Sequence, residues 1–487
     1  MPEILFQLPD HPGANLQTRI REMLVAAILD GHLPAGSPVP SGRKLAQQLK
    51  VARNTVVLAY EHLVDEGYLV ARERSGFYVN DDILKGRAVG PAAAVHKQEN
   101  SPHWHRRLKG GLREQRQITK PADWQNYDFP FLYGQYDPAL FPIADWRECC
   151  RDAASVRAIH AWASDRADQD DPELLEQLHT RVLPRRGVWA NPDEILVTLG
   201  AQHALYLAAE LLVSRDTVVG MEEPGYTDAR HVFQVHSNRV KPLPLDQGGL
   251  IVDEQLNDCE CVYVTPSHQL PTTVTMSAER RTALLRAAEE KDFVLLEDDY
   301  EAELNFAETP HAALKSADHS GRVIYIGSLS KTLAPGLRMG YLVGPKAFID
   351  EARILRRLML RHPPANNQFI VSQFLKRGFH DALVRRLHHS LEERWRVTRD
   401  ALQEQLPGAL ENTAFGGSAF WLRLPDHIDP DVLEHDAREL GLLVETGNVF
   451  FACPQHAPPY IRLGFSSIAT SKINEGIKTL AQLIRRY

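Results

Sequence analysis

The feature that most constrains the fold is an alternation of short apolar runs with longer helical patterns between residues 194 and 344. Apolar runs of this length are typical of buried strands. Strands separated by helices pair into a mostly parallel sheet that the helices wrap. The runs are EILVTLG (194–200), TVVGMEE (217–223), CVYVTP (261–266), FVLLEDD (293–299), VIYIGSLS (323–330) and MGYLVG (339–344).

The C-terminal stretch has sparser strand patterns. FWLRL (420–424) and YIRLGFS (460–466) predict strands of a smaller α+β portion. A chain of 487 residues is expected to hold more than one domain. We therefore predict an α/β body with a smaller C-terminal portion over residues 126–487.

Residues 12–80 have a different pattern and predict a separate α+β domain. Apolar positions recur there at helical spacing and then give way to two short strand-like runs. Ser41 can cap the second helix, and Gly76 is available for the turn in ARERSG between the strands. Three helices and a β-hairpin predict a winged helix-turn-helix. The expected elements are helices over 16–29, 42–49 and 53–63 and strands over 68–70 and 77–79.

Between the two domains, residues 81–125 mix proline, glycine and charged residues without periodicity. This composition predicts a linker with at most short helical pieces. The N-terminus has no basic-then-apolar signal, and no apolar run approaches the roughly 18 residues of a membrane span. We therefore expect a cytoplasmic protein that does not bind membranes.

The five cysteines do not have the spacing of a zinc finger or of a paired disulfide framework. Cys259 and Cys261 lie in an apolar, strand-like run, where buried and unreactive thiols are expected. No metal site is predicted.

The charge distribution in the N-terminal domain favours DNA as a partner. Residues 31–60 carry four basic residues and no acidic residue, although the whole chain has a net charge of −8. A recognition helix needs N-terminal side chains that contact bases, flanked by groups that bind phosphate. The alternative is a small protein-interaction module with solvated charges. The candidate DNA-binding residues are Arg53, Asn54 and Thr55 at the third helix, Ser41, Arg43 and Lys44 at the second, and Arg72, Arg74 and Gly76 in the wing.

The most specific chemical motif is SLSKTLAPGLRMGY (328–341). A lysine condenses with an aldehyde when its amine can lose a proton, which burial and neighbouring positive charge favour. Ser328, Ser330 and Arg338 surround Lys331 and suit a phosphate monoester. An ordinary surface lysine near a helix start is the alternative interpretation.

The run that ends at Asp298, Asp299 and Tyr300 strengthens the interpretation that Lys331 binds a cofactor with an aldehyde and a phosphate. Pyridoxal phosphate (PLP) needs a carboxylate that keeps its pyridine nitrogen protonated, and Asp298 stands at a strand end. Tyr300 can donate to the phenolate oxygen of the cofactor. The other candidates are Gly200, Ala201 and Gln202 as a phosphate cup at a helix start, Tyr226 as a stacking ring, His268 as a contact to the ring or as a structural residue, and Arg462 as a carboxylate clamp.

Two motif sets carry a resemblance to known families. The stretch from LPAGSPVPSGRKLA to EGYLVARERSGFYV resembles the GntR-type winged helix, including the R-N-T-V-x-x-A-Y helix. Residues 126–487 resemble fold-type I aminotransferases, and the order of the parts resembles MocR/GabR-type regulators. The family's usual P-T-G is P-T-T here, with Thr273 in place of glycine, so this loop carries an added side chain beside the expected cofactor.

The resemblance implies a role for each candidate residue and a head-to-tail homodimer that binds double-stranded operator DNA. Lys331 is then the Schiff-base lysine, Asp298 the pyridinium partner, Tyr300 the phenolate partner, Tyr226 the stacking ring, Arg338 and Ser328 phosphate ligands and Arg462 the effector-carboxylate arginine.

Three functions remain open at this point. A regulator can sense a small amine or amino acid through external aldimine formation at Lys331. A working aminotransferase with an accessory head uses the same lysine, and a third possibility is a regulator that senses PLP itself. A DNA-binding domain favours sensing over turnover, and Arg462 with Tyr226 favours an amino-acid effector. GABA-like, taurine-like and diamino-acid compounds all fit.

Overall fold

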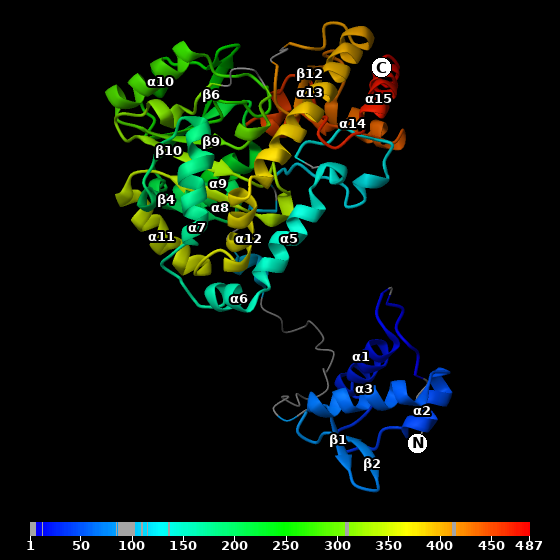
Figure 1. Cartoon of the computed structure of the whole chain (residues 1–487). Helices are drawn as coiled ribbons and strands as arrows, with labels where there is room; N and C mark the ends of the chain where they lie inside the picture. Colours follow the sequence, from blue (N-terminus) through cyan, green and yellow to red (C-terminus); the bar gives the residue numbers. More distant parts are fainter. Residues whose placement is uncertain are drawn as a thin grey trace. The chain divides into compact units, whose positions relative to one another are not determined.

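The structure is a computed structural model of the chain. It describes residues 6–11, 13–83, 85, 103–108, 111–113, 115–134, 137–306, 311–411 and 415–487. Two units, Met1–Leu108 and Lys109–Tyr487, are each compact and are considered separately (Figure 1). Much of the predicted linker 81–125 lies outside the described residues. None of the described helices is long and apolar enough to cross a membrane.

The N-terminal unit contains the three predicted helices and the predicted hairpin. Its core joins Ile20 and Leu24 of the first helix to Leu45 of the second and to Val56 and Tyr60 of the third. The elements are α1 (Leu16–Leu29), α2 (Gly42–Leu49), α3 (Arg53–Asp65), β1 (Leu69–Arg72), β2 (Gly76–Val79) and the short α4 (Trp104–Arg107). The winged helix-turn-helix prediction is confirmed.

The hairpin is tighter than predicted. Arg72 pairs with Gly76, so both strands extend into the stretch expected to form the turn. Arg74 has φ +60° and Gly76 has φ +103°. Positive φ values at these positions close a three-residue loop, and glycine adopts such a conformation without a steric cost. The wing tip is therefore residues 73–75.

The second unit is built on an eight-stranded sheet with the order β4-β11-β10-β9-β8-β5-β6-β7. β11 runs antiparallel to both its neighbours and β7 runs antiparallel to β6, while the other neighbouring pairs are parallel. The strands are β4 (Ile195–Thr198), β5 (Val218–Glu223), β6 (Arg239–Asp246), β7 (Gly249–Leu250), β8 (Cys261–Val264), β9 (Val294–Asp299), β10 (Val323–Ser328) and β11 (Gly340–Val343). The predicted mostly parallel sheet is confirmed.

Helices bury both faces of this sheet. Tyr325 and Ile326 are neighbours in β10 but belong to two different core clusters, because successive strand side chains point to opposite faces. The helices are α5 (Ile143–Ala153), α6 (Val156–Trp162), α7 (Pro172–Gln177), α8 (Gly200–Leu212), α9 (Thr227–His236), α10 (Ala278–Lys291), α11 (Lys346–Leu360) and α12 (Ala365–Lys376).

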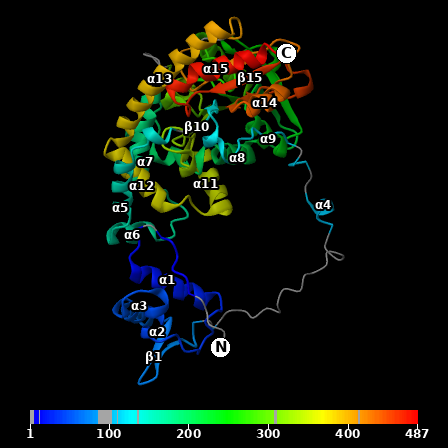
Figure 2. The ribbon, with the colours of Figure 1, turned by 90° about the vertical axis from the view of Figure 1, so that its right-hand side faces the viewer.

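The C-terminal portion is a smaller sheet covered by helices, as predicted. β15 lies between β12 and β14, and the long helix α13 packs along α15 (Figure 2). β13 pairs in parallel with β3, which brings the chain that follows the linker into this core. The elements are β3 (Phe129–Pro130), α13 (Phe379–Gln405), β12 (Ala419–Arg423), α14 (Pro430–Glu439), β13 (Leu442–Leu443), β14 (Glu445–Thr446), β15 (Tyr460–Gly464) and α15 (Thr470–Ile484).

Candidate functional site

A cavity of about 130 Å³ lies at the carboxyl ends of β9 and β10 and the start of α8. Ligands of open α/β folds bind in this region, because the loops that follow the strands leave a crevice there. Nine residues proposed from the sequence line the cavity together. The lining residues are Tyr133, Ala201, Gln202, Tyr226, Leu270, Asp298, Tyr300, Ser328, Ser330, Lys331, Pro335 and Arg338.

Lys331 follows β10 and extends into the cavity. Its Nζ lies 4.2 Å from the centre of the Tyr133 ring. Gly134 has φ +72°, a conformation that favours glycine, and a Cβ there would lie 2.7 Å from this nitrogen. Burial lowers the pKa of Lys331 to about 8. A substantial fraction of the amine is therefore neutral near pH 8 and able to attack an aldehyde.

Asp298 and Asp299 end β9, but only Asp298 lines the cavity. Its Oδ2 accepts a hydrogen bond of 2.7 Å from the Tyr263 hydroxyl, while Oδ1 is buried and has no hydrogen-bond partner among the described residues. Burial raises the pKa of Asp298 to about 7. Asp299 instead accepts hydrogen bonds of 2.8 Å from Arg186 and Tyr325. Oδ1 of Asp298 is thus an acceptor that suits a protonated ring nitrogen.

The start of α8 and the residues around Lys331 lie together at one side of the cavity. Gly200 has φ +76°, and a Cβ there would lie 3.2 Å from the Arg338 guanidinium. The exposed Arg338 donates a hydrogen bond of 3.3 Å to the Leu199 carbonyl. The backbone N–H of Ser330 donates a hydrogen bond of 3.2 Å to Oγ of Ser328. Backbone N–H groups at a helix start, with a guanidinium beside them, suit a phosphate monoester.

The aromatic candidates differ in their surroundings. The Tyr226 hydroxyl lies 3.2 Å from both Gln202 and Asp228. The Tyr300 hydroxyl donates a hydrogen bond of 2.8 Å to the His268 carbonyl. The His268 ring is outside the cavity lining, with Nε2 3.6 Å from a Glu301 carboxylate oxygen. The backbone of His268 therefore holds the Tyr300 hydroxyl, while its ring lies beside Glu301.

Arg462 is completely buried in β15. Its guanidinium carbon lies 3.6 Å from the centre of the Tyr133 ring, and its nearest carboxylate is Glu445, at 3.6 Å. None of its three guanidinium nitrogens has a hydrogen-bond partner among the described residues. Such donors are costly to leave unsatisfied in a buried position, so the site suits an incoming anion.

The DNA-binding candidates occupy the starts of two helices in the N-terminal unit. Ser41 accepts a hydrogen bond of 3.3 Å from the backbone N–H of Lys44 and so caps α2. Arg43, Lys44, Arg53 and Asn54 are exposed, and Thr55 is half-buried. The hydroxyl of Tyr60 in α3 donates to the Pro40 carbonyl at 2.7 Å, which joins α3 to the loop before α2.

The wing carries two further basic side chains. The guanidinium of Arg72 lies 4.2 Å from the centre of the Tyr78 ring and 3.8 Å from an Asp81 oxygen. Arg74 is exposed at the tip, and Gly76 is the first residue of β2. The wing therefore has one guanidinium packed on the hairpin and one that points away from the core.

Two family models match the chain. Residues 16–79 match bacterial regulatory proteins of the gntR family, and residues 135–480 match aminotransferase class I and II. The chain is 40% identical to the HTH-type transcriptional regulator TauR of Rhodobacter capsulatus over 483 residues, which is 99% of both chains. It is 30% identical to the probable rhizopine catabolism regulatory protein MocR of Rhizobium meliloti, over 96% of this chain and 93% of that protein. The chain belongs to the MocR-type transcription regulators.

The aminotransferase-like part of this MocR-type regulator also matches solved structures. LysN, an α-aminoadipate aminotransferase of Thermus thermophilus complexed with N-(5′-phosphopyridoxyl)-L-leucine, superposes with a TM-score of 0.70 and 25% identity. The match covers 79% of this chain and 98% of LysN. The prediction of a fold-type I aminotransferase body is confirmed.

Thr273, where glycine is usual in the family, has φ +65°. Glycine adopts this left-handed conformation freely, whereas a β-branched residue pays a steric cost. Thr273 is buried and its N–H donates to the Gln269 carbonyl at 2.8 Å, but it is outside the cavity lining. The departure from the family pattern therefore acts on the backbone of this loop.

Several residues of the site were not proposed from the sequence. Tyr133 contacts Lys331 and Arg462, Glu445 lies between Arg462 and Lys120, and Tyr263 holds Asp298. Tyr263 occupies an apolar strand, where a buried tyrosine is ordinary. Lys120 and Tyr133 precede the strand pattern of the body, and no local spacing links them to the motif around Lys331.

Proposed function

We propose that this MocR-type regulator binds PLP and operator DNA, and that it senses a small primary amine that carries an anionic group. The observation that carries the proposal is the arrangement of the cavity. A lysine with a lowered pKa, a buried carboxylate and a cup suited to an anion meet there, beside a buried guanidinium. Within the described part of the chain, Oδ1 of the carboxylate and all three guanidinium nitrogens have no hydrogen-bond partner.

The residues present fit the aldehyde, the ring nitrogen, the ring face and the phosphate of PLP. Lys331 is positioned to bond covalently to the cofactor, Asp298 to accept from the ring nitrogen and Tyr226 to contact the ring. The start of α8, Ser328 and Arg338 form the phosphate cup. When bound, PLP supplies an aldehyde that condenses reversibly with primary amines. The cofactor-linked relative LysN supports the same assignment.

For DNA, we propose that Arg53 and Asn54 contact base edges in the major groove and that Arg43 and Lys44 contact phosphates. Arginine suits guanine and asparagine suits adenine in bidentate hydrogen bonds. The gntR-family match over residues 16–79 supports this interface. A head-to-tail homodimer would present two such helices to two half-sites.

Sensing is favoured over turnover because the chain contains a complete domain of a DNA-binding type, which a sensor needs and a catalyst does not. An aminotransferase with an accessory head is the second candidate, since it uses the same cavity. Regulation by PLP alone is less well supported, because it gives no anionic ligand to the buried guanidinium of Arg462.

The decisive experiment combines spectroscopy with operator binding. The PLP-loaded full-length protein is titrated with candidate amines while its visible absorbance, its affinity for operator DNA and the appearance of a keto product are measured. A sensor shows an amine-dependent spectrum and amine-dependent operator binding or transcription, with negligible product. Rapid multiple turnover with a keto-acid acceptor, without any effect on DNA binding or transcription, would instead identify an aminotransferase.

A further inference from the structure

Glu445 is a buried carboxylate that lies between two cations from different parts of the chain. Its Oε1 lies 3.5 Å from Nζ of Lys120 and accepts a hydrogen bond of 3.3 Å from the N–H of Tyr133. Its Oε2 lies 3.6 Å from a guanidinium nitrogen of Arg462 and has no hydrogen-bond partner among the described residues. One negative charge thus faces two positive charges in a buried place.

Lys120 and Arg462 face the same region as Lys331. The Tyr133 ring centre lies 5.7 Å from Lys120 Nζ, 4.2 Å from Lys331 Nζ and 3.6 Å from the Arg462 guanidinium carbon. A Cβ at Gly134 would lie within 4 Å of both lysine nitrogens. Lys120 also donates a hydrogen bond to the Tyr133 carbonyl. Its side chain retains 23% exposure.

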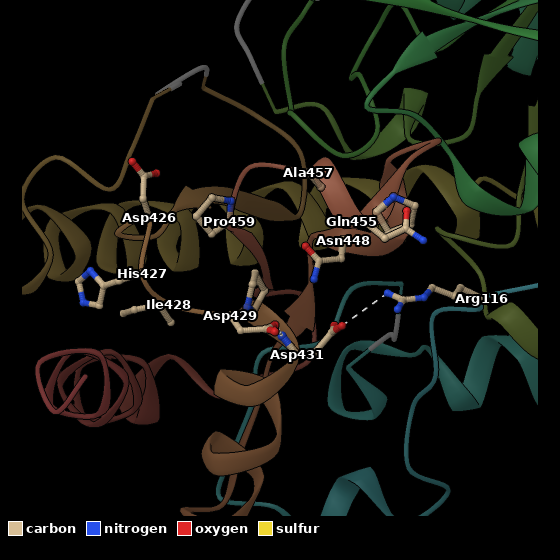
Figure 3. A pocket seen from close by; sticks show the side chains of 12 residues that line it. Arg116, Asp426, His427, Ile428, Asp429, Asp431, Asn448, Gln455, Ala457 and Pro459 are labelled. Carbon is tan, nitrogen blue, oxygen red and sulfur yellow. Dashed lines mark hydrogen bonds and ion pairs between the residues drawn. The ribbon is translucent and has the colours of Figure 1, made fainter.

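Lys120 ends a stretch that we call the tether segment, residues 115–120. Ile118 packs against the apolar cluster that contains Tyr133 and Tyr300. Gln115, Gln117 and Ile118 line a cavity together with residues of α8 and α9. In the neighbouring pocket of Figure 3, Arg116 pairs with Asp431 of α14 at 3.5 Å. The tether segment is therefore held against the body on either side of Arg116.

We propose that Lys120 is a second ligand, with Arg462, for the anionic group of the effector, so that effector binding fixes the tether segment. This inference rests on the proposed function. An anion placed here balances the two cations that Glu445 balances only in part, and it supplies the acceptors that Arg462 lacks. The effector class is therefore a primary amine linked by a short chain to a carboxylate or sulfonate.

The regulatory consequence follows from the position of Lys120 in the chain. The tether segment lies near the start of the second unit and within the predicted linker 81–125. A ligand that binds Lys120 more strongly than Glu445 does would favour the conformation of the tether segment in which Lys120 contacts the ligand. DNA binding can change only if the ligand binds this conformation and its alternative with different affinities.

The test compares an amine with and without the anion in the PLP-loaded full-length protein. Affinities for 4-aminobutyrate and butylamine, and for 2-aminoethanesulfonate and ethylamine, are obtained from absorbance titrations. Lys120→Met is expected to lower the preference for the anionic member of the favoured pair by about 10- to 100-fold, the size of one lost charge-assisted hydrogen bond. Because each preference is a ratio, effects on the cofactor itself cancel.

The matched control is Arg116→Ala, which removes an exposed ion pair of the same tether segment and should leave the preference unchanged. Lys120→Arg keeps the cation and should retain most of the preference for the anionic amine. Lys120→Gln replaces Lys120→Met if that variant does not fold. Hydrogen exchange of residues 115–120 should slow when wild-type protein binds the anionic amine, but not when Lys120→Met does.

An unchanged preference in Lys120→Met and Lys120→Gln would overturn the inference while leaving the proposed function intact. Equal losses for both members of a pair would also overturn it, because Lys120 would then act on the cofactor rather than on the anion. If wild-type protein responds to none of these amines, the proposed function fails for this ligand class and the inference falls with it.

Discussion

The two units present their candidate functional side chains in opposite ways. In the N-terminal unit, Arg43, Arg53 and Asn54 are exposed at helix starts. In the second unit, Asp298 and Arg462 are buried and have polar atoms without hydrogen-bond partners among the described residues. A substitution in the first unit should therefore remove a contact with a partner and little else. A substitution in the second unit should change the charge balance of a buried site, and with it the affinity for the cofactor and the cofactor's absorbance.

The strongest test of this difference is Lys331→Ala, which removes the nitrogen that we propose bonds to PLP. We expect complete loss of the visible absorbance band and of cofactor mass trapped by borohydride. Lys346→Ala is the matched control, because Lys346 is an exposed lysine that pairs with Asp350 at 3.1 Å. If Lys331→Ala still traps the cofactor covalently, the assignment of this lysine is wrong.

Asp298→Asn addresses the buried carboxylate at nearly constant shape. We expect PLP affinity to fall by about 10- to 100-fold, since a charge-assisted hydrogen bond to the ring nitrogen is lost. Asp426→Asn changes an exposed carboxylate of the same unit and should leave affinity and spectrum unaltered. Unchanged PLP binding by Asp298→Asn would move the pyridinium role to another residue.

The same variant has a pH signature in the cofactor-free protein. Burial raises the pKa of Asp298 from its ordinary 3.8 to about 7, so the folded state holds this proton more tightly than the unfolded state. The resulting stability is fully present below pH 4 and is lost as the pH rises through 7. Asp298→Asn should therefore flatten the fall in the free energy of unfolding between pH 4 and pH 7, measured by denaturant titration.

The N-terminal unit allows two kinds of DNA contact to be compared, namely contacts to bases and contacts to phosphates. Arg53→Ala should weaken operator binding by about 1–3 kcal/mol and relax preference at one base position. Lys44→Ala should weaken all sequences alike and reduce the salt dependence of binding. Neither should alter the visible spectrum, because both residues lie in the first unit. Unaltered binding by both variants would refute the recognition-helix assignment.

The elements that the sequence predicted are those with a strong local pattern. The strand-end motifs around Asp298 and Lys331 come together because parallel strands end at one edge of the sheet, which the alternation of runs already implies. β6 was missed because its sequence RVKPLPLD holds two prolines and lacks an apolar run, as suits a strand near the sheet edge. Lys120, Tyr133 and Glu445 were missed because only tertiary packing joins the chain on either side of β3 to β14 and β15.

The smallest expected effect is the pH dependence of PLP loading, which reports directly on the buried environment of Lys331. With a pKa of about 8, the neutral fraction of its amine rises about fivefold from pH 7 to pH 8 and less than about twofold above that. A lysine at its ordinary pKa of 10.5 would give about tenfold per pH unit over the same range. The measurement is the initial rate of absorbance growth after PLP is added to the cofactor-free protein.

Two substitutions should move this profile in opposite directions. The charge of Glu301 raises the pKa of Lys331 and that of Lys120 lowers it. Glu301→Gln should therefore bring the plateau of the loading rate to lower pH, and Lys120→Met should bring it to higher pH. Shifts of the same sign in both variants, or a rate that keeps rising tenfold per unit beyond pH 9, would show that burial and neighbouring charge do not set the reactivity of this lysine. Burial would then distinguish the two candidate sites in structure but would not explain the reactivity of Lys331.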